Sequence, residues 1–283
     1  MSYNQGGLIE ATDYNGFVAS VNAIWGTGSG DSGYGQSNTL STVSTSNTVT
    51  ATQWATLISR IDSMRQHQSG VTSGIGQPST GDLIEYISTL NSEISTITTN
   101  RLDRNVGTNT ASTAFGSVSW NDSSPNEADV QCTFTWGSAN QMRYFFNTGG
   151  TVTFNAVNSS FSGTTKSDNW DTIANNLSTQ TIDADVFYNT LGTNFTTLGS
   201  ATGSGADYGS NVLYLQAKLN ASAGSATVLT LRGYFVDGSS DSFNDSISGT
   251  ARIDGTANAA ATTYISNSWG TISASNSTVA NSF

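Results

Sequence analysis

The sequence predicts an α+β protein in which an N-terminal helical region is followed by a mainly antiparallel β-sandwich or jelly-roll-like domain. Up to about residue 105, apolar residues recur at intervals of three to four, which is typical of amphipathic helices. Leu102–Thr113 looks like a linker. After it, short runs alternate between apolar and polar residues and are separated by polar turn-like clusters, which is typical of a sandwich. We therefore expect a helical region at 1–105 and a β-rich domain at 106–283.

A first short helix is expected within residues 8–26. Thr12 or Asp13 can cap its N-terminus. Its apolar residues fall on one face: Phe17, Val21, Ile24 and Trp25. The glycine-rich stretch Gly26–Gly33 ends this helix in a loop. It lacks the Gly-Lys-Ser/Thr ending of a phosphate-binding loop and no clear strand precedes it, so nucleotide binding is not expected.

A second helix is expected from about Thr50 to Gly70. Thr50 and Gln53 have the spacing of a capping box. The helix then carries one apolar stripe, formed by Trp54, Leu57, Ile58, Ile61 and Met64. His67, the single histidine of the chain, falls on the last turn. There the helix dipole favours a charged imidazole, and we prefer this structural role to a functional one.

A third helix is expected from about Thr80 to Arg101. Its apolar residues are spaced as the seam of a short coiled coil: Leu83, Ile87, Leu90, Ile94 and Ile97. Two arrangements are compatible with this seam. It can pack on the second helix as an antiparallel hairpin. Alternatively, it can pack on copies of itself, with a trimer as the first expectation and a ring as the second, which would make 1–105 a docking and oligomerisation region.

The β region contains several short strand-like runs and one helix. The runs are Val118–Trp120, Val130–Trp136, Val186–Tyr188, Val212–Leu219, Thr227–Val236 and Ile247–Ile253. The helix is expected near Ser167–Leu177, capped by Asp168, with Trp170 facing the sheet. Ser268–Phe283 is expected to be an edge strand or an arm.

Gln141–Ala156 is expected to be a β-hairpin at the centre of the β domain. Apolar and polar side chains alternate along its first arm, and Asn147-Thr148-Gly149-Gly150 has the chemistry of a turn with positive φ. Arg143 stands among aromatic residues, where an ion pair or a cation–π contact is expected rather than catalysis. The structural residues predicted here are Arg143, Phe145, Asn147, Gly149 and Gly150.

Charge and composition exclude several classes of function. Only 10% of the residues are charged and the net charge is −11, so a nucleic-acid partner is not expected. No apolar run approaches the roughly 20 residues of a membrane span. The N-terminus lacks the features of a signal peptide. The single cysteine, Cys132, forms no intrachain disulfide and is expected to be a small buried hydrophobe.

The sequence shows no catalytic motif, and we expect neither an enzyme nor a cofactor. One His and one Cys do not suggest a triad or a zinc site. Two pairs of carboxylates, Glu127 with Asp129 and Asp183 with Asp185, lack the clustered aromatics of a sugar cleft. The weak candidate for a metal site is a calcium turn formed by Asp237, Asp241 and Asp245, although a solvated acidic turn is preferred. Trp120 and Trp269 are the tryptophans least constrained to a core.

Several motifs resemble structural proteins of tailed-bacteriophage virions, particularly tail- or neck-associated proteins of phages of marine cyanobacteria. The motifs span roughly residues 8–175, and they are Asp13-Tyr14-Asn15, Trp25-Gly26, Gly33-Tyr34-Gly35-Gln36, Val49-Thr50-Ala51-Thr52-Gln53-Trp54, His67-Gln68, Arg143-Tyr144-Phe145-Phe146-Asn147-Thr148-Gly149-Gly150 and Asn169-Trp170. The resemblance implies an assembly component without enzymatic activity.

The expected function is therefore that of a virion component, made in the host cytoplasm, that binds copies of itself and other virion proteins. One alternative is a glycan-binding adhesin or fibre module that recognises a host surface glycan. A second alternative is a polysaccharide depolymerase.

Overall fold

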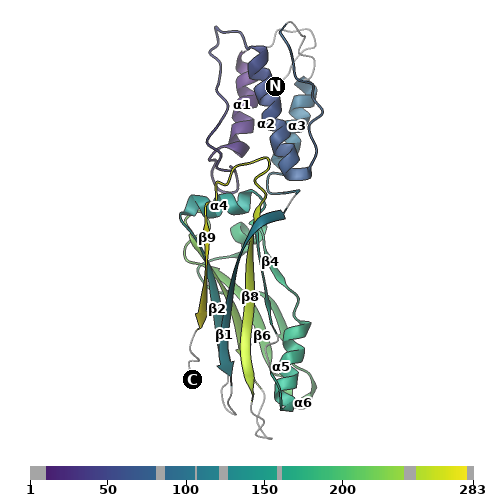
Figure 1. Cartoon of the computed structure of the whole chain (residues 1–283), viewed down its shortest axis with the longest axis vertical. Coiled ribbons are helices and arrows are strands. Elements are labelled where there is room, and N and C mark those ends of the chain that lie inside the picture. The colour runs from purple at the N-terminus through teal and green to yellow at the C-terminus, as the bar shows by residue number, and fades with distance from the viewer. Residues whose placement is uncertain are drawn as a thin grey trace. The chain divides into compact units, whose positions relative to one another are not determined.

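The computed structural model describes residues 11–80, 87–105, 107–120, 127–157, 161–238 and 247–278. Helices near the N-terminus are followed by two mainly antiparallel sheets, which confirms the predicted α+β class with a β-sandwich (Figure 1). The chain divides into two compact units. Unit 1 consists of Met1–Asn109, Arg143–Gly150 and Ala259–Trp269, and unit 2 consists of Thr110–Met142, Thr151–Asn258 and Gly270–Phe283. The units therefore do not follow a single cut between residues 105 and 106.

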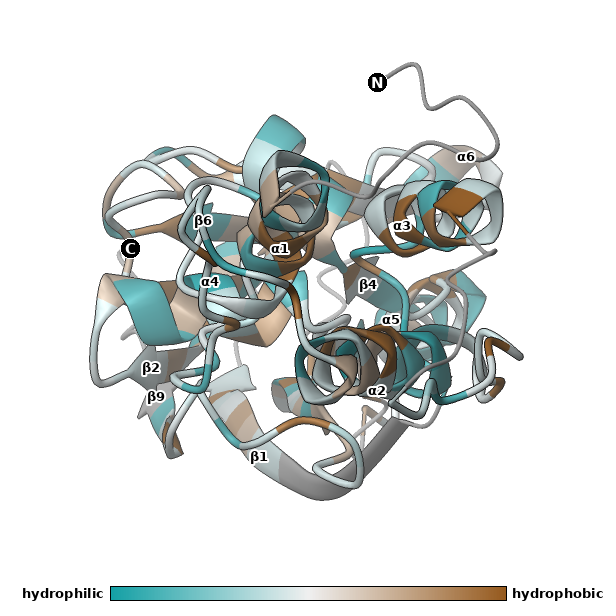
Figure 2. Ribbon diagram, turned by 90° about the horizontal axis from the view of Figure 1, so that it is seen from above, coloured by the Kyte–Doolittle hydropathy of each residue, from teal (hydrophilic) through white to brown (hydrophobic). Residues whose placement is uncertain are grey.

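Unit 1 is built on three helices, α1 (Ala11–Trp25), α2 (Ala51–Ser69) and α3 (Ile87–Thr99). The predicted apolar stripes of α1 and α2 are buried, and hydrophobic residues mark all three helices in the end-on view of Figure 2. The capping box of Thr50 and Gln53 is present, and Gly70 ends α2 with a left-handed backbone. In the described part of α3, Ile87, Leu90 and Ile97 are buried and Ile94 is half-buried.

The seam of α3 packs on helices of its own chain, as the first of the two predicted arrangements proposed. However, α2 and α3 run parallel, so the predicted antiparallel hairpin is wrong. Gln68 near the end of α2 donates to the carbonyl of Ile97 near the end of α3, at 2.9 Å. One turn earlier, Arg65 pairs with Glu93 at 2.8 Å. Leu83, the first residue of the predicted seam, lies outside the described residues.

Extended segments that return along each helix make the parallel arrangement possible. Two asparagines on one face of α1 hold the first return. Asn22 donates to the carbonyl of Leu40 and accepts from its N–H, at 2.8 and 2.9 Å, and Asn15 does the same with Val43, at 2.8 Å each. On α2, Asp62 accepts from the backbone N–H of Ser73 in the second return, at 2.7 Å. Side chains of each helix therefore bind the strand-like segment that follows it.

Unit 2 is built around the two sheets. One has the strand order β1-β8-β3-β4 and the other the order β5-β6-β7-β2-β9. Their bounds are β1 (Gly107–Trp120), β2 (Glu127–Trp136), β3 (Thr151–Ala156), β4 (Gln180–Ile182), β5 (Thr196–Thr202), β6 (Val212–Leu219), β7 (Val228–Val236), β8 (Gly249–Ala260) and β9 (Ile272–Thr278). The alternation of buried and half-exposed residues in β6 and β7 matches the predicted period of two.

Two glycines bring the sheets close together. A Cβ at Gly233 of β7 would lie 2.4 Å from the side chain of Ile253 on β8. In the opposite direction, a Cβ at Gly255 of β8 would lie 2.8 Å from the side chain of Leu231 on β7. Each glycine thus leaves the space that a large residue of the other sheet fills. Cys132 is buried in this core, as predicted, and burial raises the pKa of its thiol to about 12.

Short helices complete the chain. The predicted helix in the β region is present as α5 (Thr165–Asn176), but Thr164 caps it and Asp168 lies inside it. α6 (Gly205–Tyr208) precedes β6. The expected strand at Val186–Tyr188 is instead part of the π-helical turn η1 (Val186–Thr190).

The predicted hairpin at Gln141–Ala156 is wrong in its first arm. α4 (Ala139–Asn147) occupies that arm, and only the return arm is a strand, β3. β3 pairs with β4 and β8. All residues from Met142 to Gly150 are buried. The stretch fits both periods: Met142, Phe145 and Phe146 have the spacing of one helix face, whereas Met142, Tyr144 and Phe146 have the spacing of one strand face.

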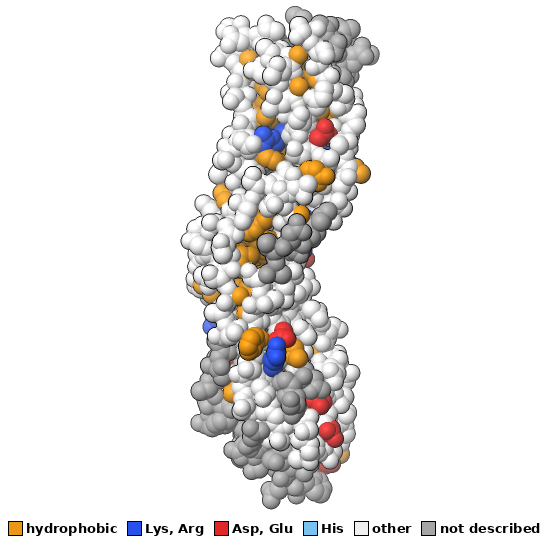
Figure 3. Space-filling view, in the orientation of Figure 1, with side chains coloured by type: hydrophobic (Ala, Val, Ile, Leu, Met, Phe, Trp, Pro, Cys, Tyr) orange, Lys and Arg blue, Asp and Glu red, His pale blue; other side chains and the backbone are white. Residues whose placement is uncertain are grey.

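The surface is dominated by uncharged groups. In the space-filling view, charged side chains are sparse on the face that is shown, and most of the described atoms belong to the backbone or to polar uncharged side chains (Figure 3). None of the described helices combines the length and the apolarity that crossing a membrane requires.

Candidate functional site

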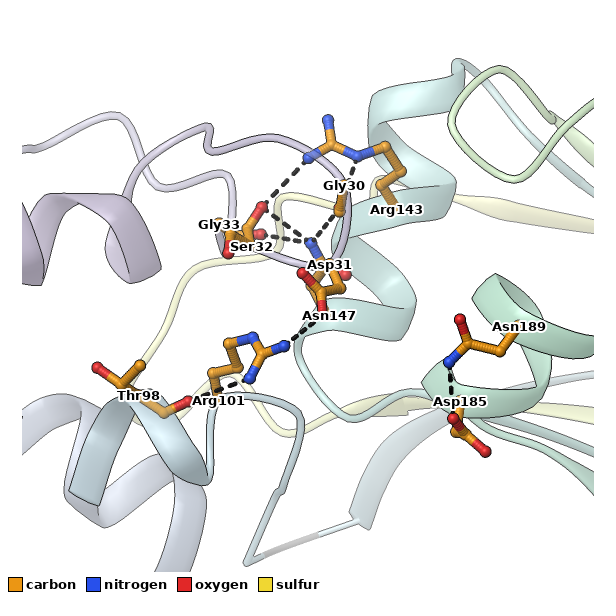
Figure 4. Close-up of polar contacts among 10 residues, drawn as sticks. All are labelled: Gly30, Asp31, Ser32, Gly33, Thr98, Arg101, Arg143, Asn147, Asp185 and Asn189. Atoms are coloured by element: carbon orange, nitrogen blue, oxygen red, sulfur yellow. Dashed lines mark hydrogen bonds and ion pairs between the residues drawn. The ribbon is translucent and has the colours of Figure 1, made fainter. Parts of the chain in front are cut away.

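α4 contributes two buried side chains that clamp the glycine loop after α1. Arg143 Nε donates to the carbonyl of Gly30 at 3.0 Å, and its Nη2 donates to that of Ser32 at 3.2 Å. One helical turn later, Asn147 Nδ2 lies 3.2, 3.1 and 3.1 Å from the carbonyls of Gly30, Ser32 and Gly33 (Figure 4). Asn147 is fully buried and Arg143 is 7% exposed. These donors satisfy loop carbonyls that would otherwise be buried at a cost of about 1–3 kcal/mol each.

The clamp gives the predicted residues of this stretch a definite structural role. The Arg143 guanidinium also lies 5.7 Å from the ring centroid of Tyr144, which is the expected cation–π contact. Phe145 packs edge-on against Phe146, with 4.9 Å between ring centroids. Beside the clamp, Asp31 forms an ion pair with Arg101.

Gly149 and Gly150 are both required, for different reasons. Gly149 has φ +78°, as the predicted turn chemistry demands. Gly150 has no positive φ, which corrects the expectation for this residue. A Cβ at position 150 would lie 2.4 Å from the carbonyl oxygen of Phe145, so Gly150 is needed for space.

A second buried polar cluster joins α2 to the segment that follows the glycine loop. Gln68 donates to the hydroxyl of Tyr34 at 2.9 Å, and His67 packs edge-on against the Tyr34 ring. Burial lowers the pKa of His67 to about 4, so its imidazole is neutral at neutral pH. The predicted attraction between a charged His67 and the end of the helix therefore does not operate. Gln36 exchanges two hydrogen bonds with the backbone of Ser266, at 2.8 and 2.9 Å.

One groove lies within unit 1. It lies between α2 and the segment Ala259–Trp269 and has a volume of about 320 Å³. Hydroxyl and aromatic groups dominate its lining, which comprises Trp25, Asn38, Thr56, Ser59, Arg60, Ser63, Thr262, Thr263, Tyr264, Ile265 and Ser266. We refer to this feature as the hydroxyl groove.

The guanidinium of Arg60 is held firmly in the hydroxyl groove. Its Cζ lies 4.0 Å from the ring centroid of Trp25. Its Nη1 donates to Asn38 Oδ1 at 3.1 Å, and the same oxygen accepts from Trp25 Nε1 at 3.0 Å. Tyr264 also lines the groove and is 37% exposed. A fixed cation, hydroxyls and an exposed aromatic ring can together recognise a small polar ligand.

The calcium candidate is only partly within the described residues, because Asp241 and Asp245 lie outside them. Asp237 follows β7 and is paired with Lys166 of α5, with 2.6 Å between Oδ2 and Nζ. Lys166 is fully buried and Asp237 nearly so. The ammonium group therefore holds Asp237 in a structural ion pair. No cluster of potential metal ligands occurs among the residues that the structure describes.

The carboxylate pairs also serve the fold. Asp183 accepts from the backbone N–H of Val186 and Asp185 from the side chain of Asn189, both at the start of the π-helical turn. Asp129 pairs with Arg232 at 2.6 Å. Trp120 and Trp269 are 1% and 2% exposed, so neither forms an open sugar platform.

Two further features were not predicted from the sequence: the hydroxyl groove and an aromatic–cationic row on the outer face of β6 and β7. In that row the guanidinium of Arg232 lies 3.9 Å from the ring centroid of Tyr234, and Tyr234 stacks on Tyr214. The aromatic and basic residues at alternate positions of the two predicted strands, Tyr214 and Lys218 in one and Arg232 and Tyr234 in the other, could have indicated the row. No comparable signal indicates the groove, because Arg60 and Tyr264 are far apart in the sequence. Family models, curated proteins and solved structures were all searched, and none matches this chain.

Proposed function

We propose that this chain is a structural component of a tailed-phage virion, associated with the tail, baseplate, neck or a fibre. In this proposal it docks to other virion proteins and assembles with copies of itself. One observation supports the proposal most directly. The motifs that resemble virion proteins are scattered along the sequence, but several of them contact one another in unit 1.

The motif Gly33–Gln36 is the centre of these contacts. Asn147, from a motif more than a hundred residues away, binds the carbonyl of Gly33. Gln68 of the His67-Gln68 motif binds the hydroxyl of Tyr34. At Gly35, φ is +72° and a Cβ would lie 2.3 Å from the ring of Tyr144. The resemblance therefore concerns residues that build the frame of unit 1, which suits a building block better than an enzyme.

The surface composition fits the same role. A particle component is made in the host cytoplasm and must stay soluble until it docks. With 10% charged residues, this chain relies on hydroxyl and amide groups for its solubility. Such a surface leaves few charges to be desolvated when neighbouring subunits cover it.

Virion association can be tested on purified particles of the source virus. Particles are banded on a density gradient and the peptides of this chain are quantified by mass spectrometry, with the major capsid protein as positive control and a phage-encoded cytoplasmic enzyme as negative control. We expect the chain to co-band with the capsid protein in a fixed ratio. Its recovery only with the soluble enzyme would refute the proposal.

Self-assembly is tested separately by sedimentation velocity of the purified chain over a wide range of concentrations. A trimer or larger ring is expected, formed by surfaces other than the apolar seam of α3, which packs within its own chain. A monomer at every concentration, without a partner in the particle, would remove assembly with copies of itself.

A further inference from the structure

We propose that the hydroxyl groove binds a saccharide that carries a carboxylate group. This inference goes beyond the virion role and does not depend on it, because a saccharide site can exist inside or outside a particle. Three features of the groove carry the inference: a fixed guanidinium, a hydroxyl-rich wall and an exposed aromatic ring.

The guanidinium of Arg60 is prepared for an anion. Trp25 covers one face of it and Asn38 holds one of its nitrogens, so little side-chain freedom is left to lose on binding. Among the described residues, none of the ion pairs involves Arg60. By contrast, Arg65 on the same helix pairs with Glu93. Asn38 accepts from Nη1 of Arg60. A planar guanidinium can donate two further N–H groups to the two oxygens of a carboxylate.

The walls of the groove suit the rest of a sugar. Thr56, Ser59 and Ser63 recur along one face of α2, and Thr262 and Thr263 stand in the opposite wall. Thr56 and Ser63 donate to the carbonyls of Thr52 and Ser59, at 2.7 and 2.9 Å, so their hydroxyl oxygens are left to accept from the hydroxyls of a sugar. Tyr264, which lines the groove and is 37% exposed, can offer an apolar ring face for the C–H groups of a pyranose ring.

The overall charge opposes a ligand with many negative charges more strongly than a ligand with one. The chain carries a net charge of −11, which repels a polyanion such as a nucleic acid at long range. One guanidinium can still attract one carboxylate at contact. A volume of about 320 Å³ lies at the lower end of the usual range for small-molecule pockets, which fits one or two sugar residues.

Binding can be tested by titrating the ¹⁵N-labelled full chain with small sugars and following amide chemical shifts. The acidic probes are methyl β-D-glucuronide and N-acetylneuraminic acid. Methyl β-D-glucoside is the neutral match of the first probe, and acetate tests a bare carboxylate. At least one acidic sugar should shift the amides around Arg60 and Thr262–Ser266. The glucoside and acetate should bind about tenfold more weakly or not at all, because one charge-assisted contact or the sugar ring is missing.

Variants assign the binding to the groove. Arg60→Gln should weaken binding of the acidic sugar about tenfold or more. Tyr264→Ser, on the exposed rim, should weaken it while the fold is kept. Arg252→Gln removes an arginine of unit 2 that pairs with Asp254, and should leave binding unchanged.

Several outcomes would overturn the proposal. These are the absence of shifts with both acidic sugars, equal binding of the glucoside, equal binding of acetate, or unchanged affinity in folded Arg60→Gln and Tyr264→Ser. Particle association of the chain would be unaffected by any of them, so failure here is distinguishable from failure of the virion role.

Discussion

Asn147 and Arg143 show how single residues stabilise unit 1. Both are buried polar side chains, and both donate to backbone carbonyls of one loop. The sequence pattern predicted both residues to be structural but placed Arg143 on a hairpin arm and Asn147 at its turn. Their partners could not be predicted, because Gly30–Gly33 has no side-chain feature that marks it as an acceptor. The contact depends on a tertiary approach of segments more than a hundred residues apart.

His67 gives a pH dependence that can be attributed to one group, because it is the only histidine. Its pKa falls from 6.5 to about 4 on folding. As the pH drops, the unfolded chain therefore binds the proton first, and protonation favours unfolding. The contribution is fully present above pH 6.5 and is lost between pH 6.5 and 4.

We expect the wild type to lose about 2–3 kcal/mol of unfolding free energy between pH 7 and 4.5 beyond the loss in His67→Gln. Denaturant titrations of both proteins at the two pH values measure this difference. Carboxylates titrate in both proteins and cancel. Equal losses in the two proteins, or an NMR titration of the imidazole near pH 6.5, would contradict the buried neutral histidine.

A substitution at Gly150 tests whether a glycine is needed after α4 because space is limited or because the backbone conformation requires it. Gly150→Ala places a methyl group against the Phe145 carbonyl and should cost about 1–3 kcal/mol of unfolding free energy. Gly76→Ala is the matched control, because Gly76 has no positive φ and no atom within 4 Å of an added Cβ. Thermal and chemical denaturation should show a change within about 0.5 kcal/mol for the control. If both variants are equally stable, the tight contact at Gly150 is absent.

At the level of elements, the sequence predicted the apolar stripes of helices and several strands, but it did not predict the relative direction of α2 and α3. The α2 stripe could be predicted because it recurs over 19 residues, whereas the nine residues of α4 fit both a helical and an alternating period. The seam of α3 did not show that α3 runs parallel to α2. The length of the connection between α2 and α3 is a clue to their relative direction. The described residues 70–80 alone, at about 3.3 Å per residue, are enough to return along α2, which spans about 28 Å at 1.5 Å per residue.

The asparagines of α1 should hold the first return segment locally. Asn22→Ala removes both partners of the Leu40 backbone, and Asn15→Ala removes both partners of Val43. Each should cost about 1–2 kcal/mol. In native-state hydrogen exchange, Asn22→Ala should accelerate exchange mainly at Leu40, and Asn15→Ala mainly at Val43. Each variant is therefore the control for the other. If hydrogen exchange is accelerated uniformly in both variants, the hydrogen bonds of Asn15 and Asn22 do not stabilise the return segment locally.

At the level of the whole molecule, unit 1 depends on three separate segments of chain. Arg143–Gly150 supplies the clamp on the glycine loop, and Ala259–Trp269 supplies the backbone that Gln36 binds. The sequence pattern suggested a single boundary near residue 105, because helical periodicity stops there. Periodicity reports local structure, so it could not show that two later segments complete the helical unit.

A fragment comprising residues 1–109 should therefore not fold on its own. It retains α1, α2 and α3 but lacks the donors from α4 and the partner of Gln36, so buried carbonyls are left without partners. We expect a broad thermal transition without cooperativity, measured by circular dichroism, beside a sharp one for the full chain. A sharp transition of the fragment would show that the later segments are dispensable.

The three-segment composition of unit 1 also has a consequence for synthesis on the ribosome. The first segment ends at Asn109, but the last residues that complete the unit extend to Trp269, 160 residues later. At about 5–20 residues per second, the nascent helices wait roughly 10–30 s for their final partners. During this interval the apolar stripes of α1, α2 and α3 are only partly covered. We therefore expect chaperones that cover exposed hydrophobic surface to bind the nascent chain until translation has passed Trp269.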